Sequence, residues 1–208
     1  MNLGLVPTKG NLILSKNTLR LSKGGYDLLD KKRTILINEM MGLISRAEDI
    51  QSQIDQVFSD AYIALQRANI SEGISIVKEI SADVPVADNL NIRFKSVMGV
   101  EIPEIKVKDE KPELVYGFLG TTNMLDEAVE KFRKVKMLTE KLAEVETSVY
   151  RLAMNIKKTQ KRANALKNII IPRYTDIVKD MTNVLEEKER EEFSRLKIIK
   201  NKKNSKKY

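Results

Sequence analysis

The chain contains no cysteine, no histidine and no tryptophan, and aromatic residues make up only 5% of its 208 residues. Without cysteine and histidine it forms no disulfide, offers no thiolate or imidazole to a metal ion, and has no catalytic group of those two kinds. So few aromatic residues also argue against a large globular core. The absence of cysteine fits a reducing cytosol.

Long hydrophobic runs are missing as well. The first ten residues, MNLGLVPTKG, lack the apolar segment of a signal peptide. Nowhere do about 18 apolar residues follow one another, as a membrane-spanning helix requires. We therefore predict a cytoplasmic protein that is neither secreted by a standard signal nor inserted into the membrane.

Charged residues, in contrast, are abundant and make up 32% of the chain, with a net charge of +8. Abundant Lys, Glu, Leu, Ile and Ala, together with apolar residues at heptad spacing, is typical of long paired helices that bury only a narrow stripe. We expect a fold dominated by α-helices, namely a long antiparallel two-helix coiled coil with a mid-chain excursion that contains a short β-hairpin.

The first helix is predicted over residues 1–72, with Thr8 as its cap and Gly73 at its close. Its seam residues alternate in steps of three and four, as in a coiled coil. They are Leu12, Ser15, Leu19, Ser22, Tyr26, Leu29, Arg33, Leu36, Met40, Leu43, Ala47, Ile50, Ile54, Val57, Ala61, Ala64 and Ala68.

The second helix is predicted over residues 123–208, capped by Thr122 or Asn123 and ending in a basic tail. Pro172 interrupts it, and the seam steps there change to two fours in succession, which indicates a local disturbance of the coil. The seam comprises Leu138, Leu142, Val145, Val149, Leu152, Ile156, Thr159, Ala163, Leu166, Ile170, Tyr174, Ile177 and Met181. If the pair is antiparallel and Ala68 lies near Glu127, we expect Ile54 to face the region of Leu142. Leu36 should then face the region of Thr159 or Ala163, within one heptad.

Residues 73–122 form the excursion, because Pro85, Pro103 and Pro112 exclude a long helix there. Apolar and polar residues alternate over 91–97 and 100–102, which predicts two strands that turn near Met98 and Gly99. A connector between two helices needs fewer residues, so we interpret the excursion as an interaction surface. We also expect the hairpin to lie outside the seam.

Both ends of the chain are basic. Residues 195–208 carry seven Lys or Arg and no acidic residue, and the first 33 residues carry seven against two acids. These ends either keep the protein soluble or bind an acidic partner. No nucleotide-binding loop, dinucleotide fingerprint or zinc-protease motif is present, so we predict no cofactor, no metal and no catalytic site in this chain. The run of Glu residues over 186–192 is interpreted as a solvated helix face.

Several segments nevertheless resemble one family. RANAL at 162–166, IPR at 171–173 and LEEKEREEF at 185–193 are similar to the C-terminal helix of the D subunit of the V-type (archaeal and bacterial A/V-type) rotary ATPase. PTK at 7–9, GYDLL at 25–29 and KKR at 31–33 resemble its first helix, and LVYGFL at 114–119 resembles the segment before its second helix. The resemblance covers nearly the whole chain in the family's order.

The resemblance implies a central rotor axle, a non-catalytic component that couples ATP hydrolysis or synthesis in a catalytic head to ion transport across the membrane. Its partners would be the catalytic A and B subunits, the small F subunit of the stalk and the funnel subunit above the membrane ring, and the protein would be peripheral to the membrane. Residues assigned to the catalytic ring are Lys9, Lys16, Arg20, Arg190, Arg195, Lys197 and Lys200. Those assigned to the small stalk subunit are Ile92, Phe94, Val97, Val100 and Ile102.

Two other functions fit the residues without the resemblance. One is a basic coiled-coil protein that binds nucleic acid through its terminal lysines, and the other is a purely structural tether. Few aromatic residues stand among the basic ones for stacking on bases, and the charges gather at the termini and do not follow one face. Neither alternative accounts for the ordered resemblance.

Overall fold

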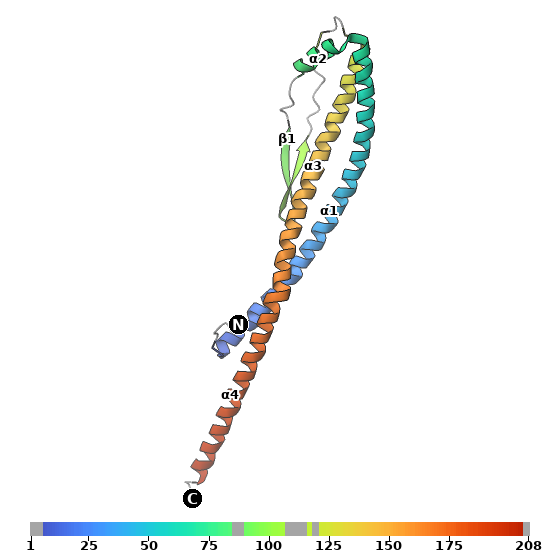
Figure 1. Cartoon of the computed structure of the whole chain (residues 1–208). Helices are drawn as coiled ribbons and strands as arrows, with labels where there is room; N and C mark the ends of the chain where they lie inside the picture. Colours follow the sequence, from blue (N-terminus) through green and yellow to red (C-terminus); the bar gives the residue numbers. More distant parts are fainter. Residues whose placement is uncertain (1–5, 85–89, 107–115, 118–120, 206–208) are drawn as a thin grey trace. The chain divides into compact units, whose positions relative to one another are not determined.

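The computed structural model describes residues 6–84, 90–106, 116–117 and 121–205. Its elements are α1 (Lys9–Glu72), α2 (Ile74–Asp83), β1 (Asn91–Val97), β2 (Val100–Lys106), α3 (Asn123–Ala165), the π-helical turn η1 (Leu166–Ile170) and α4 (Ile171–Ser205). Figure 1 shows α3 and α4 following one another without a break and the hairpin beside α3. The predicted fold class is confirmed.

Helix α1 begins where the sequence predicts. The Thr8 hydroxyl accepts a hydrogen bond from the backbone N–H of Asn11, at 3.2 Å, and so satisfies one of the free donors of the first turn. The helix ends at Glu72, and Gly73 follows with a φ of 93°, a conformation that glycine adopts without the steric cost of a side chain. Both predicted boundaries are confirmed.

A short helix, α2, follows Gly73 directly and was not predicted. Its Val77 is 8% exposed and packs in one cluster with Ala68 of α1 and Leu125 of α3. The proline at 85 excludes a long helix but leaves room for the ten residues of α2, whose apolar residues Ile74, Val77 and Ile80 share a face. The excursion therefore begins with a helix that closes the end of the α1–α3 pair.

The start of α3 is held by α1. The carboxylate of Glu72 accepts hydrogen bonds from the backbone N–H of Thr122, at 2.6 Å, and from its hydroxyl, at 2.8 Å. The Thr122 carbonyl in turn accepts the N–H of Leu125 at 3.0 Å. The predicted boundary at Thr122 or Asn123 is confirmed, and the negative charge of Glu72 lies where the helix dipole favours it.

The disturbance predicted at Pro172 takes the form of η1. Within it the helix widens to a π-turn, and the N–H of Ile171 donates to the carbonyl of Leu166, five residues earlier. Pro172 has no N–H to give to the carbonyl of Asn168, so the regular hydrogen-bond ladder cannot continue through this point. The change of seam steps marked the position correctly, but not the type of turn.

The hairpin turns at Met98 and Gly99, as predicted, with φ angles of 50° and 76°. Two residues with positive φ are typical of the tight turn that suits the twist of paired strands. The prediction that the hairpin lies outside the seam is wrong. Val100, which is 3% exposed, packs in one cluster with Leu36 of α1 and Leu152 of α3, because its side chain points from β2 toward the helix pair.

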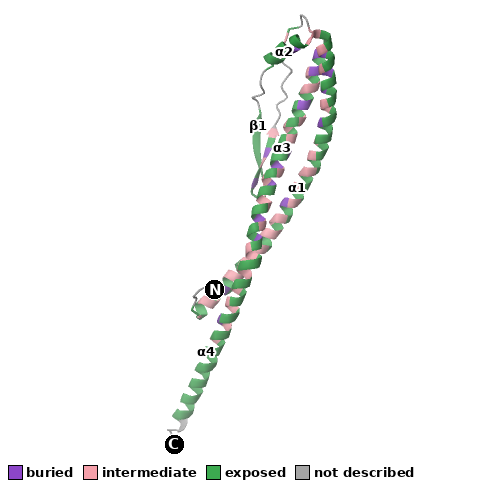
Figure 2. Ribbon diagram, in the orientation of Figure 1, coloured by how far each residue is buried: buried purple, intermediate pink, exposed green. Residues whose placement is uncertain are grey.

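The described chain forms two compact units, residues 1–33 with 157–208 and residues 34–156, and both long helical stretches contribute to both units. In the second unit, Ala68 shares a cluster with Leu125 and Leu36 shares one with Leu152, so α1 and α3 are antiparallel. Leu36 lies beside Leu152, which is one heptad from the predicted Thr159 and so within the predicted margin. Figure 2 shows the buried residues on the facing sides of α1 and α3.

Most of the buried residues of the long helices are seam residues of the sequence analysis. One exception is Ser148, which is 1% exposed, whereas the predicted seam residue Val149 is only partly buried. The Ser148 hydroxyl donates to the carbonyl of Glu144 at 2.7 Å, which satisfies the polar group inside the core. Seam residues that are buried include Ser15, Leu36, Ile54, Ala61, Ala64, Ala68, Val145, Leu152, Thr159, Ala163 and Met181.

Candidate partner-binding surfaces

In the unit formed by residues 1–33 and 157–208, polar side chains take part in joining the two helical stretches. Ser15 is 3% exposed, and its hydroxyl lies 4.0 Å from the sulfur of Met181. Arg33 donates a hydrogen bond of 2.6 Å to the side-chain oxygen of Gln160. The polar seam residues Ser15 and Arg33 thus meet polar or polarizable partners across the pair, which explains how this end pairs without a wide apolar core.

Helix α4 changes character after Leu185. Every residue from Glu186 to Lys203 is exposed, although this stretch carries large apolar side chains. Figure 2 shows this part of α4 as exposed throughout. Phe193 and Leu196 have exposed fractions of 70% and 64%, and Ile198 and Ile199 have 56% and 54%. Apolar residues grouped on an exposed helix end are typical of a surface that a partner covers.

The basic residues assigned to a partner all lie in this unit. The ammonium of Lys9 lies 2.8 Å from the carboxylate of Glu189, whose pKa it lowers by hydrogen bond and charge, while the pKa of Lys9 is raised. Arg190 and Arg195 lie 3.9 Å from acidic residues one turn earlier on α4. The remaining four are exposed: Lys16, Arg20, Lys197 and Lys200.

A second set of exposed residues, on α1, was not identified from the sequence. Leu14, Leu21 and Leu28 recur every seven residues off the seam, and their exposed fractions are 63%, 72% and 70%. A heptad repeat of leucines beside the main seam is itself a sequence signal for a second contact face. The basic residues identified from the sequence are therefore interleaved with exposed apolar ones on α1 and on α4.

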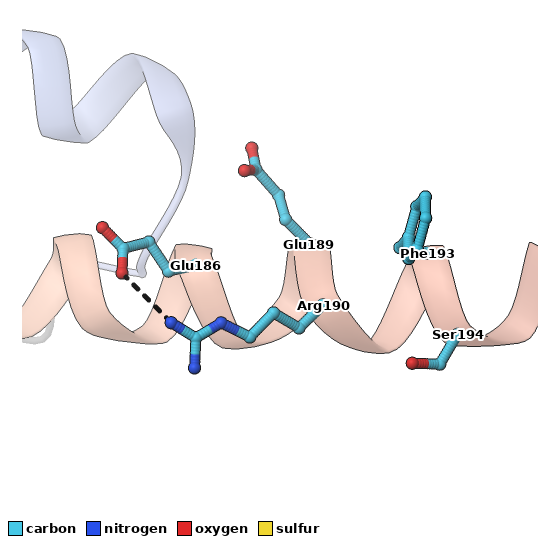
Figure 3. A pocket seen from close by; sticks show the side chains of 5 residues that line it. All are labelled: Glu186, Glu189, Arg190, Phe193 and Ser194. Atoms are coloured by element: carbon cyan, nitrogen blue, oxygen red, sulfur yellow. Dashed lines mark ion pairs between the residues drawn. The ribbon is translucent and has the colours of Figure 1, made fainter.

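Figure 3 shows the surface of α4 near Glu186 and Glu189. Arg190 points back toward Glu186, and Phe193 stands on the same helix, so these side chains border a hollow that is open to solvent. All residues that line it come from one helix. Among the described residues, no group of three or more acidic side chains is placed to hold a metal ion.

The five hairpin residues assigned to a partner separate into two sets. Ile92 and Phe94 of β1 have exposed fractions of 52% and 59%. Val100 and Ile102 of β2 pack against the chain's own helices, and Val97 is partly buried. The side chains of Ile92 and Phe94 are therefore exposed, whereas those of Val100 and Ile102 pack inside the chain. Binding by any of the five stays a prediction.

Tyr116 has the most strongly shifted pKa among the described groups. Partial burial against the cluster of Ala68, Val77 and Leu125, and then a hydrogen bond of 2.5 Å from its hydroxyl to the carboxylate of Asp126, raise the pKa to about 12. The neutral phenol is the form that donates this bond. The residue joins the described end of the excursion to the start of α3.

Comparison with known sequences decides the family. The profile of the D subunit of ATP synthase matches residues 11–201. The chain belongs to the ATP synthase D subunit family. It is 44% identical to the V-type ATP synthase D subunit of Thermotoga neapolitana over 96% of this chain and 98% of that protein. It is 38% identical to the A-type ATP synthase D subunit of Pyrococcus abyssi, over 95% and 94%, and 37% identical to that of Methanobrevibacter smithii, over 95% and 87%.

The profile match covers residues 11–201, so it includes the hairpin and nearly all of the exposed basic and apolar end of α1 and α4. Within the described residues, no helix is both long enough and apolar enough to span a bilayer. This D subunit therefore presents two candidate surfaces, the exposed basic and apolar end of α1 and α4, and the outer strand of the hairpin.

Proposed function

We propose that this member of the D subunit family is the central rotor axle of a V-type or A-type ATP synthase. It transmits rotation between a catalytic head and a membrane-bound ring, and so couples ATP hydrolysis or synthesis to ion transport. It is not itself catalytic. The protein is cytoplasmic and peripheral to the membrane, as part of a membrane-bound complex.

One observation carries the proposal beyond the family. From Glu186 to Lys203 the helix α4 buries no residue within its own chain, yet it exposes Phe193, Leu196, Ile198 and Ile199. An isolated helix end with this many exposed apolar residues is costly to leave in water, at about 25 cal/mol for each Å² of apolar surface. A ring of catalytic A and B subunits that encloses this end would cover it.

The basic residues interleaved with that apolar surface suit an axle that turns inside its socket. Lys16, Arg20, Lys197 and Lys200 are exposed on long, flexible side chains. Contacts of this kind with acidic or carbonyl-lined surfaces are individually weak and screened by salt. They attract the end into the ring without locking one orientation. The outer strand of the hairpin then serves the small F subunit of the stalk, and a funnel subunit connects the axle to the membrane ring.

A reversible tether tests the rotary role. Ser194 is exposed on α4, and the chain has no other cysteine to interfere with a Ser194→Cys variant. With a second cysteine on the facing catalytic-ring subunit, an oxidised disulfide should stop sustained ATP turnover, and reduction should restore it. The matched control is Ser194→Cys with an unmodified ring, which should turn over at the normal rate under both conditions.

The result that would end the axle proposal is full multi-turnover hydrolysis by the tethered complex. Salt-dependent binding of duplex DNA by the full chain, with a steep slope and no assembly with ring subunits, would instead support the nucleic-acid function. The two results are distinct, since the first needs an assembled complex and the second needs none.

A further inference from the structure

The two strands of the hairpin differ in whether the main-chain groups on their outer edges have hydrogen-bond partners. The turn at Met98 and Gly99 has two residues, so the closing pair Val97 and Val100 exchanges hydrogen bonds inside the hairpin. In an antiparallel pair the bonded positions alternate with positions whose N–H and C=O point outward. The outward positions are therefore Glu101, Pro103 and Ile105 on β2, and Ile92, Phe94 and Ser96 on β1.

The outer edge of β2 is partly occupied by side chains of α3 and partly blocked by a proline. The carbonyl of Glu101 accepts a hydrogen bond of 3.1 Å from Arg151, and the N–H of Ile105 donates one of 2.9 Å to the carboxylate of Glu144. Between them, Pro103 has no N–H and is buried. Proline and side-chain contacts are the devices by which proteins close a sheet edge. The helix α3 supplies both of the side chains.

The outer edge of β1 has no such protection. Within the described residues, the outward main-chain groups of Ile92, Phe94 and Ser96 form no hydrogen bond. Residues 91–96 are all exposed, and Figure 2 shows β1 largely as exposed, whereas Val100 and Pro103 of β2 are buried. The ring of Phe94 lies against Arg151, whose guanidinium carbon is 5.3 Å from the ring centre. An exposed edge with unpaired groups is a template for another strand.

We propose that the free edge of β1 binds an extended segment of a partner protein, which adds a third strand to the hairpin and carries acidic side chains opposite Arg93 and Lys95. This inference rests on the proposed function and names how the small stalk subunit is held. The main-chain groups of Ile92, Phe94 and Ser96 bind the segment, and the exposed side chains of Ile92 and Phe94 contact its apolar residues.

The charged side chains of β1 indicate which kind of segment can bind at its free edge. Arg93 and Lys95 are the charged residues of β1, and both lie on the same face of the strand. Opposite charges directly across a strand pair stabilise it, and like charges destabilise it. If a second copy of this chain paired with β1 antiparallel about Phe94, Lys95 of each copy would lie opposite Arg93 of the other. The same side chains therefore disfavour self-pairing. Within the hairpin Arg93 lies opposite Glu104, whereas Lys95 lies opposite the apolar Ile102, so the charge of Lys95 above all favours an acidic segment.

Residue-resolved hydrogen exchange on the full chain mixed with the small stalk subunit tests this mode of binding. In the free chain, the amides of Arg93, Lys95 and Val97 are protected by the hairpin and those of Ile92, Phe94 and Ser96 exchange fast. Binding of a strand should protect the second set by at least about tenfold, which corresponds to one net hydrogen bond of ordinary strength. A partner that binds only side chains would not produce this alternation.

A matched pair of variants at one position separates the main chain from the side chain. Ser96→Pro removes an outward N–H without touching a bond inside the hairpin and should weaken binding about tenfold, whereas Ser96→Ala should stay within about twofold. Unchanged protection of Lys95 and Val97 verifies that the hairpin of the proline variant is intact. If it is not, the double variant Arg93→Glu with Lys95→Glu replaces it and should weaken binding by a similar factor.

Each result decides between the alternatives. A complex that forms without protection of Ile92, Phe94 and Ser96 overturns strand addition and leaves the proposed function standing. Failure of the two proteins to form any complex overturns the partner named by the proposed function and the inference with it. Protection that appears in this chain alone and grows with its concentration shows a second copy at the edge, and also overturns the inference.

Discussion

Replacement of Val100 by alanine tests whether the hairpin is part of the core of the helix pair. Val100 is 3% exposed and shares its cluster with Leu36 and Leu152, both of which are 0% exposed. The substitution removes two carbon atoms, each worth about 0.8 kcal/mol of transfer free energy. The cavity left between three elements adds to this, so we expect a loss of about 2–3 kcal/mol in the free energy of unfolding.

Urea unfolding followed by circular dichroism at 222 nm measures the effect. The signal comes from the helices, so a shift of the midpoint shows that a change in a strand has reached the helix pair. The control is Ile92→Ala in the same hairpin. It removes more carbon atoms, but Ile92 is 52% exposed, so its effect should stay within about 0.5 kcal/mol.

A double-mutant cycle identifies the contact responsible. If Val100 acts through Leu152, the combined variant with Leu152→Ala should differ from the sum of the single effects by about 0.5–3 kcal/mol. A Val100→Ala variant with an unchanged midpoint would refute the reasoning. The hairpin would then be independent of the helices, as the sequence alone had suggested.

Three further predictions concern single polar contacts. Arg151→Ala removes both the hydrogen bond to β2 and the contact with Phe94, a loss of about 1–2 kcal/mol. Amide exchange across the hairpin should therefore become faster by a factor of about 5–30. Arg151→Lys should restore part of the protection. For Tyr116 the folded pKa of about 12 lies above the ordinary value of 10.0, so its contribution to stability is complete below pH 10 and is lost as the pH rises through 12. Tyr116→Phe should flatten that alkaline loss, and a titration at 295 nm should show one tyrosine fewer ionising near pH 12. Lys9→Met removes an exposed ion pair with Glu189, so the melting temperature should change measurably only at low salt; an equal change at high salt would contradict a screened contact.

The sequence predicted the long elements well because their periodicity is repeated many times. Steps of three and four along α1 and α3 identified most of the buried residues, and the ends at Thr8, Gly73 and Asn123 carry strong local signals. Pro172 likewise marked the position of η1. These features depend on residues close together in the chain, so single-sequence patterns contain them.

Features that depend on contacts between distant segments were not predictable in the same way. Helix α2 is short, and its Val77 is recognised as a core residue only once Ala68 and Leu125 are seen beside it. The alternation in β2 shows that Val100 and Ile102 share a face, but not whether that face meets the helices or a partner. Only the fold shows that β2 turns inward and that β1 keeps a free edge.

The exposed end of α4 shows how an interaction surface can be kept helical without a partner. From Glu186 to Lys203 no residue is buried, but this stretch consists largely of Glu, Lys and Arg, which are strong helix formers. Arg190 and Arg195 each lie within 3.9 Å of an acidic residue one turn earlier. These local terms favour the helix without requiring Phe193 and its neighbours to be buried. They remain exposed, as the proposed contact with a catalytic ring requires.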